Sequence, residues 1–150
     1  MTEIGFYHLS RSPLERALPK LLEKVLASGA RAVVRAGSDE RVEFLNGALW
    51  TYQPASFLPH GGPRDGEAAA QPVWLTTAEE NPNGANVLVL TDGTRAGDID
   101  TFERCLEMFD GNDTEAVGTA RARWTAYKQA GHALTYWQQT EQGGWEKKES

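Results

Sequence analysis

Short apolar runs alternate along the chain with segments whose apolar residues recur at helical spacing. Residues 3–9 and 30–35 are compact apolar runs with the length and composition of β-strands. Between them, residues 14–26 carry leucines and a valine three and four positions apart, which is the spacing of an amphipathic helix. The first part of the chain therefore predicts a strand, a helix and a second strand.

The ends of that helix carry their own signals. Ser12 and Glu15 stand three positions apart, as in a capping box, and Pro13 suits the first helical position. Gly29 is a favourable residue for ending the helix. Pro19 removes one backbone donor inside the pattern, but the apolar stripe continues past it. We therefore expect one bent helix.

Further apolar runs mark the remaining strands. Residues 73–76, 86–90 and 133–139 predict strands, and the last of them is expected to be the final strand. The run 86–90 is apolar at nearly every position, as in the centre of a parallel sheet that is covered on both faces. Residues 101–109 fit a helix or a strand.

Two more helices have candidate N-caps. Ser38 precedes a segment that ends near Trp50. Asp113 or Thr114 precedes a last helix, which Gly131 ends. Strands that alternate with helices imply an α/β fold with a largely parallel central sheet.

The chain shows neither an internal repeat nor a domain boundary. We expect one α/β domain over residues 1–142, followed by a polar, mobile tail over residues 143–150. Residues 51–71 are rich in Pro, Gly and Ala and predict a long surface loop.

Composition narrows the function classes. The chain has 150 residues, of which 40% are hydrophobic, and a formal net charge of −6. The surface of an acidic chain as a whole repels DNA phosphates, so direct DNA binding is disfavoured. The N-terminus lacks the features of a signal peptide, and no apolar run is long enough to span a membrane. We therefore expect a cytoplasmic protein.

The sequence contains no recognised catalytic or cofactor motif. Neither a dinucleotide-binding glycine pattern nor a phosphate-binding loop is present. His8, His60 and His132 are far apart, and Cys105 is the single cysteine. A buried, structural Cys105 is favoured over a nucleophile. We expect neither a metal nor a cofactor.

Asp92, Asp98 and Asp100 support the alternative hypothesis. They follow a predicted strand, where α/β enzymes and nucleotide-binding domains often place functional groups. Gly93 and Gly97 lie among them, which favours a turn-forming role.

The last helix holds the clearest candidate site. Between residues 116 and 131 it contains Arg121, Arg123 and Lys128 and no acidic residue. Trp124 is three positions from Arg121 and four from Lys128, so these side chains can share one face. Arginine beside an aromatic suits a ligand with a carboxylate and an apolar group. A solvated basic face remains the other interpretation of the same pattern.

The segment at residues 120–131 (ARARWTAYKQAG) resembles the last helix of the chi subunit of bacterial DNA polymerase III. Residues 6–9, 48–50 and 54–60 resemble other parts of this family, in the same order along the chain. The resemblance therefore covers nearly the whole sequence.

The resemblance implies a single Rossmann-like domain with helices on both faces, no nucleotide site and no catalysis. The family links the clamp-loader complex to the C-terminal tail of single-stranded-DNA-binding protein. That tail is acidic and ends in a sequence like Asp-Ile-Pro-Phe with a free carboxylate. Members also bind a small psi subunit that ties them to the clamp loader, and DNA is reached only indirectly.

The resemblance also assigns site residues. Arg121 falls on the arginine that meets the terminal carboxylate, Trp124 on an aromatic one turn later, and Trp50 on a tryptophan that borders the pocket. Trp50 as a core residue, and Phe57 as one that only orders its loop, remain alternatives.

Two positions depart from the family pattern. Val117 stands where some members carry lysine, and Asp110-Gly111 stand near an aliphatic position. Arg123 and Lys128 could supply charge instead. The complete set of expected peptide-binding residues is Arg121, Trp124, Trp50, Val117, Arg123, Lys128 and Phe57.

Overall fold

The computed structural model describes residues 2–51, 62, 69, 71–94, 97–141 and 144–148, with the backbone only for residues 50 and 51. Most of the predicted 51–71 loop lies outside the described residues. The elements are β1 (Glu3–Leu9), α1 (Leu14–Ala27), β2 (Ala32–Arg35), α2 (Asp39–Thr51), β3 (Val73–Thr76), β4 (Val87–Leu90), the 3-10 helix η2 (Ile99–Thr101), β5 (Arg104–Asp110), α3 (Thr114–Gln129), β6 (Ala133–Gln139) and β7 (Trp145–Lys148).

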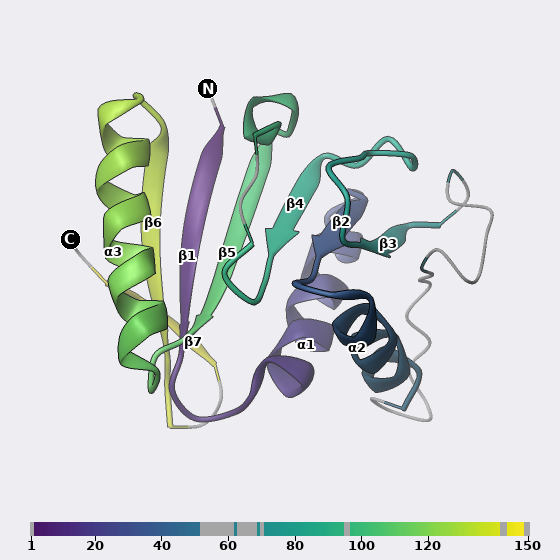
Figure 1. Cartoon of the computed structure of the whole chain (residues 1–150), viewed down its shortest axis with the longest axis horizontal. Coiled ribbons are helices and arrows are strands. Elements are labelled where there is room, and N and C mark those ends of the chain that lie inside the picture. The colour runs from purple at the N-terminus through teal and green to yellow at the C-terminus, as the bar shows by residue number, and fades with distance from the viewer. Residues whose placement is uncertain are drawn as a thin grey trace.

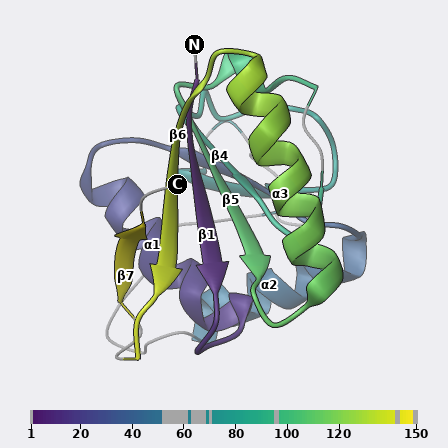
Figure 2. The ribbon, with the colours of Figure 1, turned by 90° about the vertical axis from the view of Figure 1, so that its left-hand side faces the viewer.

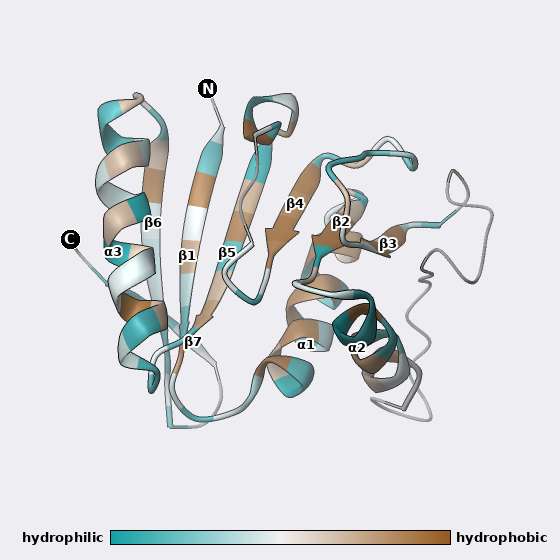
Figure 3. Cartoon of the chain, in the orientation of Figure 1, coloured by the Kyte–Doolittle hydropathy of each residue, from teal (hydrophilic) through white to brown (hydrophobic). Residues whose placement is uncertain are grey.

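The strands of the described residues form one sheet in the order β3-β2-β4-β5-β1-β6-β7 (Figure 1). All neighbouring pairs are parallel except β6 and β7, which are antiparallel. The prediction of an α/β fold with a largely parallel sheet is confirmed. β4 lies between β2 and β5 and is hydrophobic along its length, as its sequence predicts (Figure 3).

Helices cover both faces of the sheet (Figure 2). α1 and α2 pack on one face, in a core that includes Leu22, Leu45 and Val89. α3 packs on the other face, in a core that includes Phe6 and Ala120. Because successive side chains of a strand point to opposite faces, β1 contributes to both cores.

β6 is not the final strand, contrary to the sequence prediction. Trp145–Lys148 form β7, which pairs with Tyr136–Gln139 of β6. The ring of Trp145 packs edge-on against Tyr7, with 5.1 Å between ring centroids. Trp145 also packs against the core on this side of the sheet, and residues 145–148 extend the sheet beyond the predicted boundary at residue 142.

The helix caps were predicted with one error. Ser12 does not cap α1; Pro13 is the N-cap, and the Ser12 hydroxyl accepts a hydrogen bond from the Gln139 side chain at 2.6 Å. Ser38 does cap α2, because its hydroxyl accepts from the backbone N–H of Arg41 at 3.2 Å. Asp113 caps α3 by accepting from two backbone N–H groups.

The helix ends and the ambiguous segment are also resolved. Gly29 and Gly131 follow their helices with φ of 86° and 89°, a left-handed conformation that glycine adopts without strain. α1 continues through Pro19 as one helix. The ambiguous residues 101–109 end η2 and then enter β5, which is paired on both sides and buried at consecutive positions. Among the described residues, no helix is long and apolar enough to cross a membrane.

Candidate functional site

One face of α3 packs on the sheet while the rest stays exposed to solvent. Val117, Ala120 and Trp124 belong to the core on this side, and Ala120 is the buried one of these three. Figure 3 shows hydrophilic residues distributed along the helix. α3 is thus held by a narrow apolar contact, which leaves its basic residues at the surface or at its edges.

Trp124 is half-buried at the boundary between α3 and the sheet. Its ring lies edge-on to Phe6 of β1, with 5.3 Å between centroids, and to Tyr136 of β6, at 6.1 Å. Edge-to-face contacts of this kind hold an aromatic ring in one orientation. Trp124 and Tyr136 are both half-buried, so together they form an ordered, partly exposed aromatic surface.

Arg121 is exposed beside this aromatic surface. Burial raises the pKa of the Tyr136 hydroxyl, and the positive charge of Arg121 partly opposes that rise. Among the described residues, no carboxylate lies within ion-pair distance of the Arg121 guanidinium. The positively charged guanidinium of Arg121 is thus exposed to solvent next to Trp124 and Tyr136.

Val117 and Lys128 extend the same stripe of α3. Val117 lies one turn before Arg121 and is half-buried against the sheet. Lys128 lies one turn after Trp124, is exposed, and is in the last turn of the helix. The structure therefore brings Val117, Arg121, Trp124 and Lys128 together on one side of α3, as their spacing predicts.

Arg123 has a different role from the one expected. Its guanidinium forms an ion pair with Glu107 of β5 at 2.6 Å and donates to the backbone oxygens of Gly93 and Thr94. Only 11% of its side chain is exposed. These bonds occupy the charge of Arg123 within the fold, so it is not the free substitute for a missing lysine.

The structure does not describe the side chain of Trp50 or any part of Phe57, so their place at the site stays a prediction. Trp50 is in α2, on the face of the sheet opposite α3 (Figure 1). Phe57 lies outside the described residues.

At the second departure from the family pattern, His8 closes the space over Gly111. A Cβ built on Gly111 would clash with the His8 ring. The His8 ring is fixed by a 2.6 Å hydrogen bond between its Nδ1 and the Tyr136 hydroxyl.

The three aspartates of the alternative hypothesis are bound by separate partners. Asp92 pairs with Arg41 at 3.0 Å, and Asp98 pairs with the buried Arg35 at 2.5 Å. Asp100 lies 3.6 Å from His132. Each carboxylate is thus directed to a different part of the fold, which supports the structural role over a shared catalytic site.

The residues most suited to metal or nucleophilic chemistry do not form such a site either. No group of three or more His, Cys, Asp or Glu within the described ranges could hold a metal ion. Cys105 is fully buried, and burial raises the pKa of its thiol. The thiol therefore stays protonated, in agreement with its predicted structural role.

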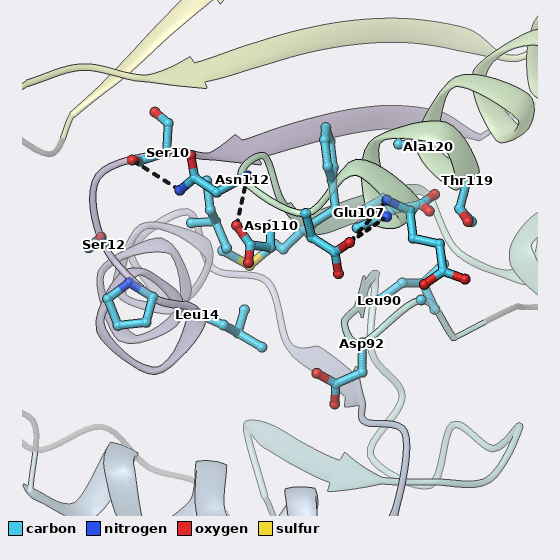
Figure 4. A pocket seen from close by; sticks show the side chains of 18 of the residues that line it. Ser10, Ser12, Leu14, Leu90, Asp92, Glu107, Asp110, Asn112, Thr119 and Ala120 are labelled. Carbon is cyan, nitrogen blue, oxygen red and sulfur yellow. Dashed lines mark hydrogen bonds between the residues drawn. The ribbon is translucent and has the colours of Figure 1, made fainter.

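A cleft of about 730 Å³ opens where β1, β4 and β5 end (Figure 4). Its walls also come from the first turn of α1 and from α3 between Glu115 and Arg123. Two of the lining residues, Asp92 and Arg123, were candidates from the sequence, but the others are scattered along the chain and were not assigned to a site. The rule that ligands of parallel α/β sheets bind at the carboxyl ends of strands was the available signal.

A family model described as DNA polymerase III chi subunit, HolC, matches residues 1–135. This match covers most of the chain, including every element from β1 to α3. The chain belongs to the DNA polymerase III chi subunit family. The family resemblance inferred from the sequence is confirmed, and the chain is placed among DNA polymerase III subunits in DNA replication.

Two named relatives agree with the family match. A "Probable DNA polymerase III subunit chi" of Rickettsia prowazekii is 33% identical over 109 residues, which is 73% of this chain and 66% of that protein. The alignment thus spans about two thirds of the Rickettsia protein. A "DNA polymerase III subunit chi" of Pseudomonas aeruginosa is 26% identical over 138 residues, 89% of this chain and 94% of that protein.

Proposed function

We propose that this chain is a non-catalytic accessory subunit that binds the acidic C-terminal tail of single-stranded-DNA-binding protein. In this role it links that protein to the clamp-loader complex, through a psi subunit or directly, and reaches DNA only through the tail. Membership of the chi family supports the place in DNA replication. The arrangement of side chains on α3 supports tail binding.

The exposed Arg121 guanidinium beside the aromatic pair Trp124 and Tyr136 carries the proposal. A guanidinium can bind a carboxylate through two parallel hydrogen bonds. The partly exposed rings of Trp124 and Tyr136 supply a surface for a neighbouring apolar side chain. A peptide that ends in phenylalanine presents both groups on one residue, since its free carboxylate and its ring share the same Cα.

The charge distribution supports an acidic ligand at this place. The chain has a net charge of −6, but α3 carries only basic residues among its charged side chains after Glu115. Arg121 and Lys128 are both exposed on it. An acidic tail is therefore attracted to α3 and repelled by most of the remaining surface. We expect micromolar affinity, equivalent to about −7 to −8 kcal/mol.

Fluorescence anisotropy with two labelled peptides tests this function. Both end in Asp-Ile-Pro-Phe; one has a free C-terminal carboxylate and the other is amidated. We expect micromolar binding of the free acid, weakened by added salt, and at least tenfold weaker binding of the amide, since it loses a charge-assisted hydrogen bond. Equal binding of the two peptides, or no binding of either, would contradict carboxylate capture.

A further inference from the structure

The cleft at the carboxyl ends of the strands has a chemistry opposite to that of α3. Leu9, Leu90 and Phe109 come from the ends of three neighbouring strands and give it apolar walls. Acidic side chains surround these walls, and the cleft has the volume of a typical ligand site, about 730 Å³. It therefore offers a shaped cavity as well as charge.

Glu107 leaves a buried oxygen without a partner in this cleft. Its Oε1 accepts from Arg123 at 2.6 Å, whereas Oε2 is buried and receives no hydrogen bond from the described residues. Only 5% of the Glu107 side chain is exposed. Figure 4 shows this carboxylate directed into the cleft, on the side of Asp92. An unsatisfied buried carboxylate oxygen is costly, and a donor that enters the cleft would remove that cost.

The rim of the cleft favours a positively charged donor. Six acidic and three basic side chains line the cleft, a formal charge of −3. Arg123, Arg41 and Arg11 are each paired with a carboxylate. The acidic lining residues are Glu15, Asp92, Glu107, Asp110, Asp113 and Glu115.

The first turn of α1 adds hydrogen-bond donors to the same cleft. Pro13 is the N-cap of α1 and no side chain caps the helix, so the backbone N–H groups of Leu14 and Glu15 lack the usual acceptor. Both residues line the cleft. Such N–H groups bind carbonyl oxygens, which a peptide backbone carries and a simple amine lacks.

We propose that this cleft binds a basic peptide segment of a protein partner. A lysine or arginine side chain of that segment donates to the free Oε2 of Glu107, and a backbone carbonyl accepts from the open N–H groups of α1. The apolar stem of the basic side chain lies along Leu9 and Leu90. The rim carboxylates attract further basic residues of the same segment.

This site is independent of the tail-binding function proposed for α3. Its negative charge repels the acidic tail, and its key residues lie on β5 and α1. Two peptides of opposite charge can therefore occupy the chain together. Failure of one site leaves the other intact, because Arg121 does not line the cleft.

NMR titration of the isotope-labelled full chain tests the proposal. The probe is the acetylated, amidated peptide Gly-Lys-Leu-Lys-Gly at physiological salt. The same peptide with norleucine in place of both lysines controls for charge, and n-butylammonium controls for the peptide backbone. We expect saturable shifts of the amide signals of Leu14, Glu15 and Glu107 with the lysine peptide alone.

Variants then test the role of Glu107. Glu107→Gln keeps an acceptor for Arg123 but removes the negative charge. It should lower the affinity for the lysine peptide at least tenfold. Glu103→Gln removes an exposed carboxylate outside the cleft and should leave affinity unchanged. Glu115→Gln on the rim should lower the affinity for the lysine peptide about twofold. This variant tests the proposal if Glu107→Gln does not fold.

Three results would overturn the proposal. The first is shifts spread over the acidic surface without saturation. The second is equal affinity of the wild type and the folded Glu107→Gln variant. The third is binding of n-butylammonium as tight as that of the peptide, which would identify a site for small amines. Anisotropy with the acidic tail peptide on the same variants reports separately on α3.

Discussion

Arg123 of α3 and Glu107 of β5 form an ion pair of 2.6 Å that is almost fully buried. It joins the middle of the helix to the sheet, and the same guanidinium also binds the loop after β4 through Gly93 and Thr94. Arg121, two positions earlier, is exposed and forms no ion pair with the described residues. Two arginines of one helix thus have opposite environments.

This difference predicts that the same substitution lowers stability strongly at Arg123 and hardly at all at Arg121. Arg123→Ala should lower the free energy of unfolding by about 3 kcal/mol or more, because it leaves the Glu107 charge buried without its partner. Arg121→Ala should change it by less than about 0.5 kcal/mol, as expected for an exposed position. Urea denaturation of both variants provides the measurement. Similar losses in both would show that the assignment of the two roles is wrong.

The contact of Gly111 with His8 predicts a coupled pair of substitutions. Gly111→Ala places a methyl group against the His8 ring and should cost about 1–3 kcal/mol of stability. In a His8→Ala background the ring is gone, so the additional cost of Gly111→Ala should be much smaller. A double-mutant cycle by thermal or urea denaturation measures this coupling. Strictly additive effects would exclude the steric explanation.

His8 also predicts a pH dependence of stability. Burial lowers the pKa of His8 below its ordinary value of 6.5, with Asp110 opposing this shift. Below about pH 6.5 the unfolded chain therefore takes up a proton at His8 before the folded chain does. The contribution of neutral His8 to the stability of the fold is complete above pH 6.5. It is lost as the pH falls towards the pKa of His8 in the folded chain.

Denaturation of the wild type and His8→Gln from pH 5 to 7.5 isolates this effect. The wild type should lose more stability on acidification than the variant, because glutamine does not titrate. Parallel losses would mean that other groups cause the pH dependence.

The sequence predicts correctly those elements whose local sequence signals agree with their tertiary contacts. β4 is a continuous apolar run and lies inside the parallel sheet, and Asp113 and Gly131 bound α3 as predicted. β5 was ambiguous because a strand buried on both faces loses the alternation that distinguishes strand from helix. β7 was missed because its pairing with β6 and the packing of Trp145 on the distant Tyr7 are tertiary contacts, which the short charged segment does not reveal by itself.

The candidate site was predicted only where helical spacing defines it. Spacing places Val117, Arg121, Trp124 and Lys128 on one stripe of α3, and the structure agrees. Spacing could not show that Arg123 is bound by Glu107, because that partner comes from another element. For the same reason the cleft, which three strands and two helices build, has no continuous signature in the sequence.

Trp124 should contribute an aromatic surface to tail binding. Trp124→Ala removes the ring beside Arg121. It should weaken the binding free energy of the peptide ending in Asp-Ile-Pro-Phe by about 1–2 kcal/mol or more. Trp124→Tyr retains a ring that can pack on Phe6 and Tyr136, and should keep most of the affinity. Anisotropy titrations compare the two, with circular dichroism as the control for folding. Wild-type affinity in Trp124→Ala would remove this residue from the site.

The most direct measurement compares two arginine variants in their affinity for the free-acid tail peptide. Arg121→Ala removes the guanidinium proposed to bind the terminal carboxylate and should cost about 1.5–3 kcal/mol, roughly tenfold to a hundredfold in affinity. Arg16→Ala removes the same charge from an exposed position on α1, on the other face of the sheet, and should bind like the wild type. A large loss in Arg121→Ala alone is the predicted result. Unchanged affinity in Arg121→Ala, or an equal loss in both variants, would contradict capture of the tail by α3.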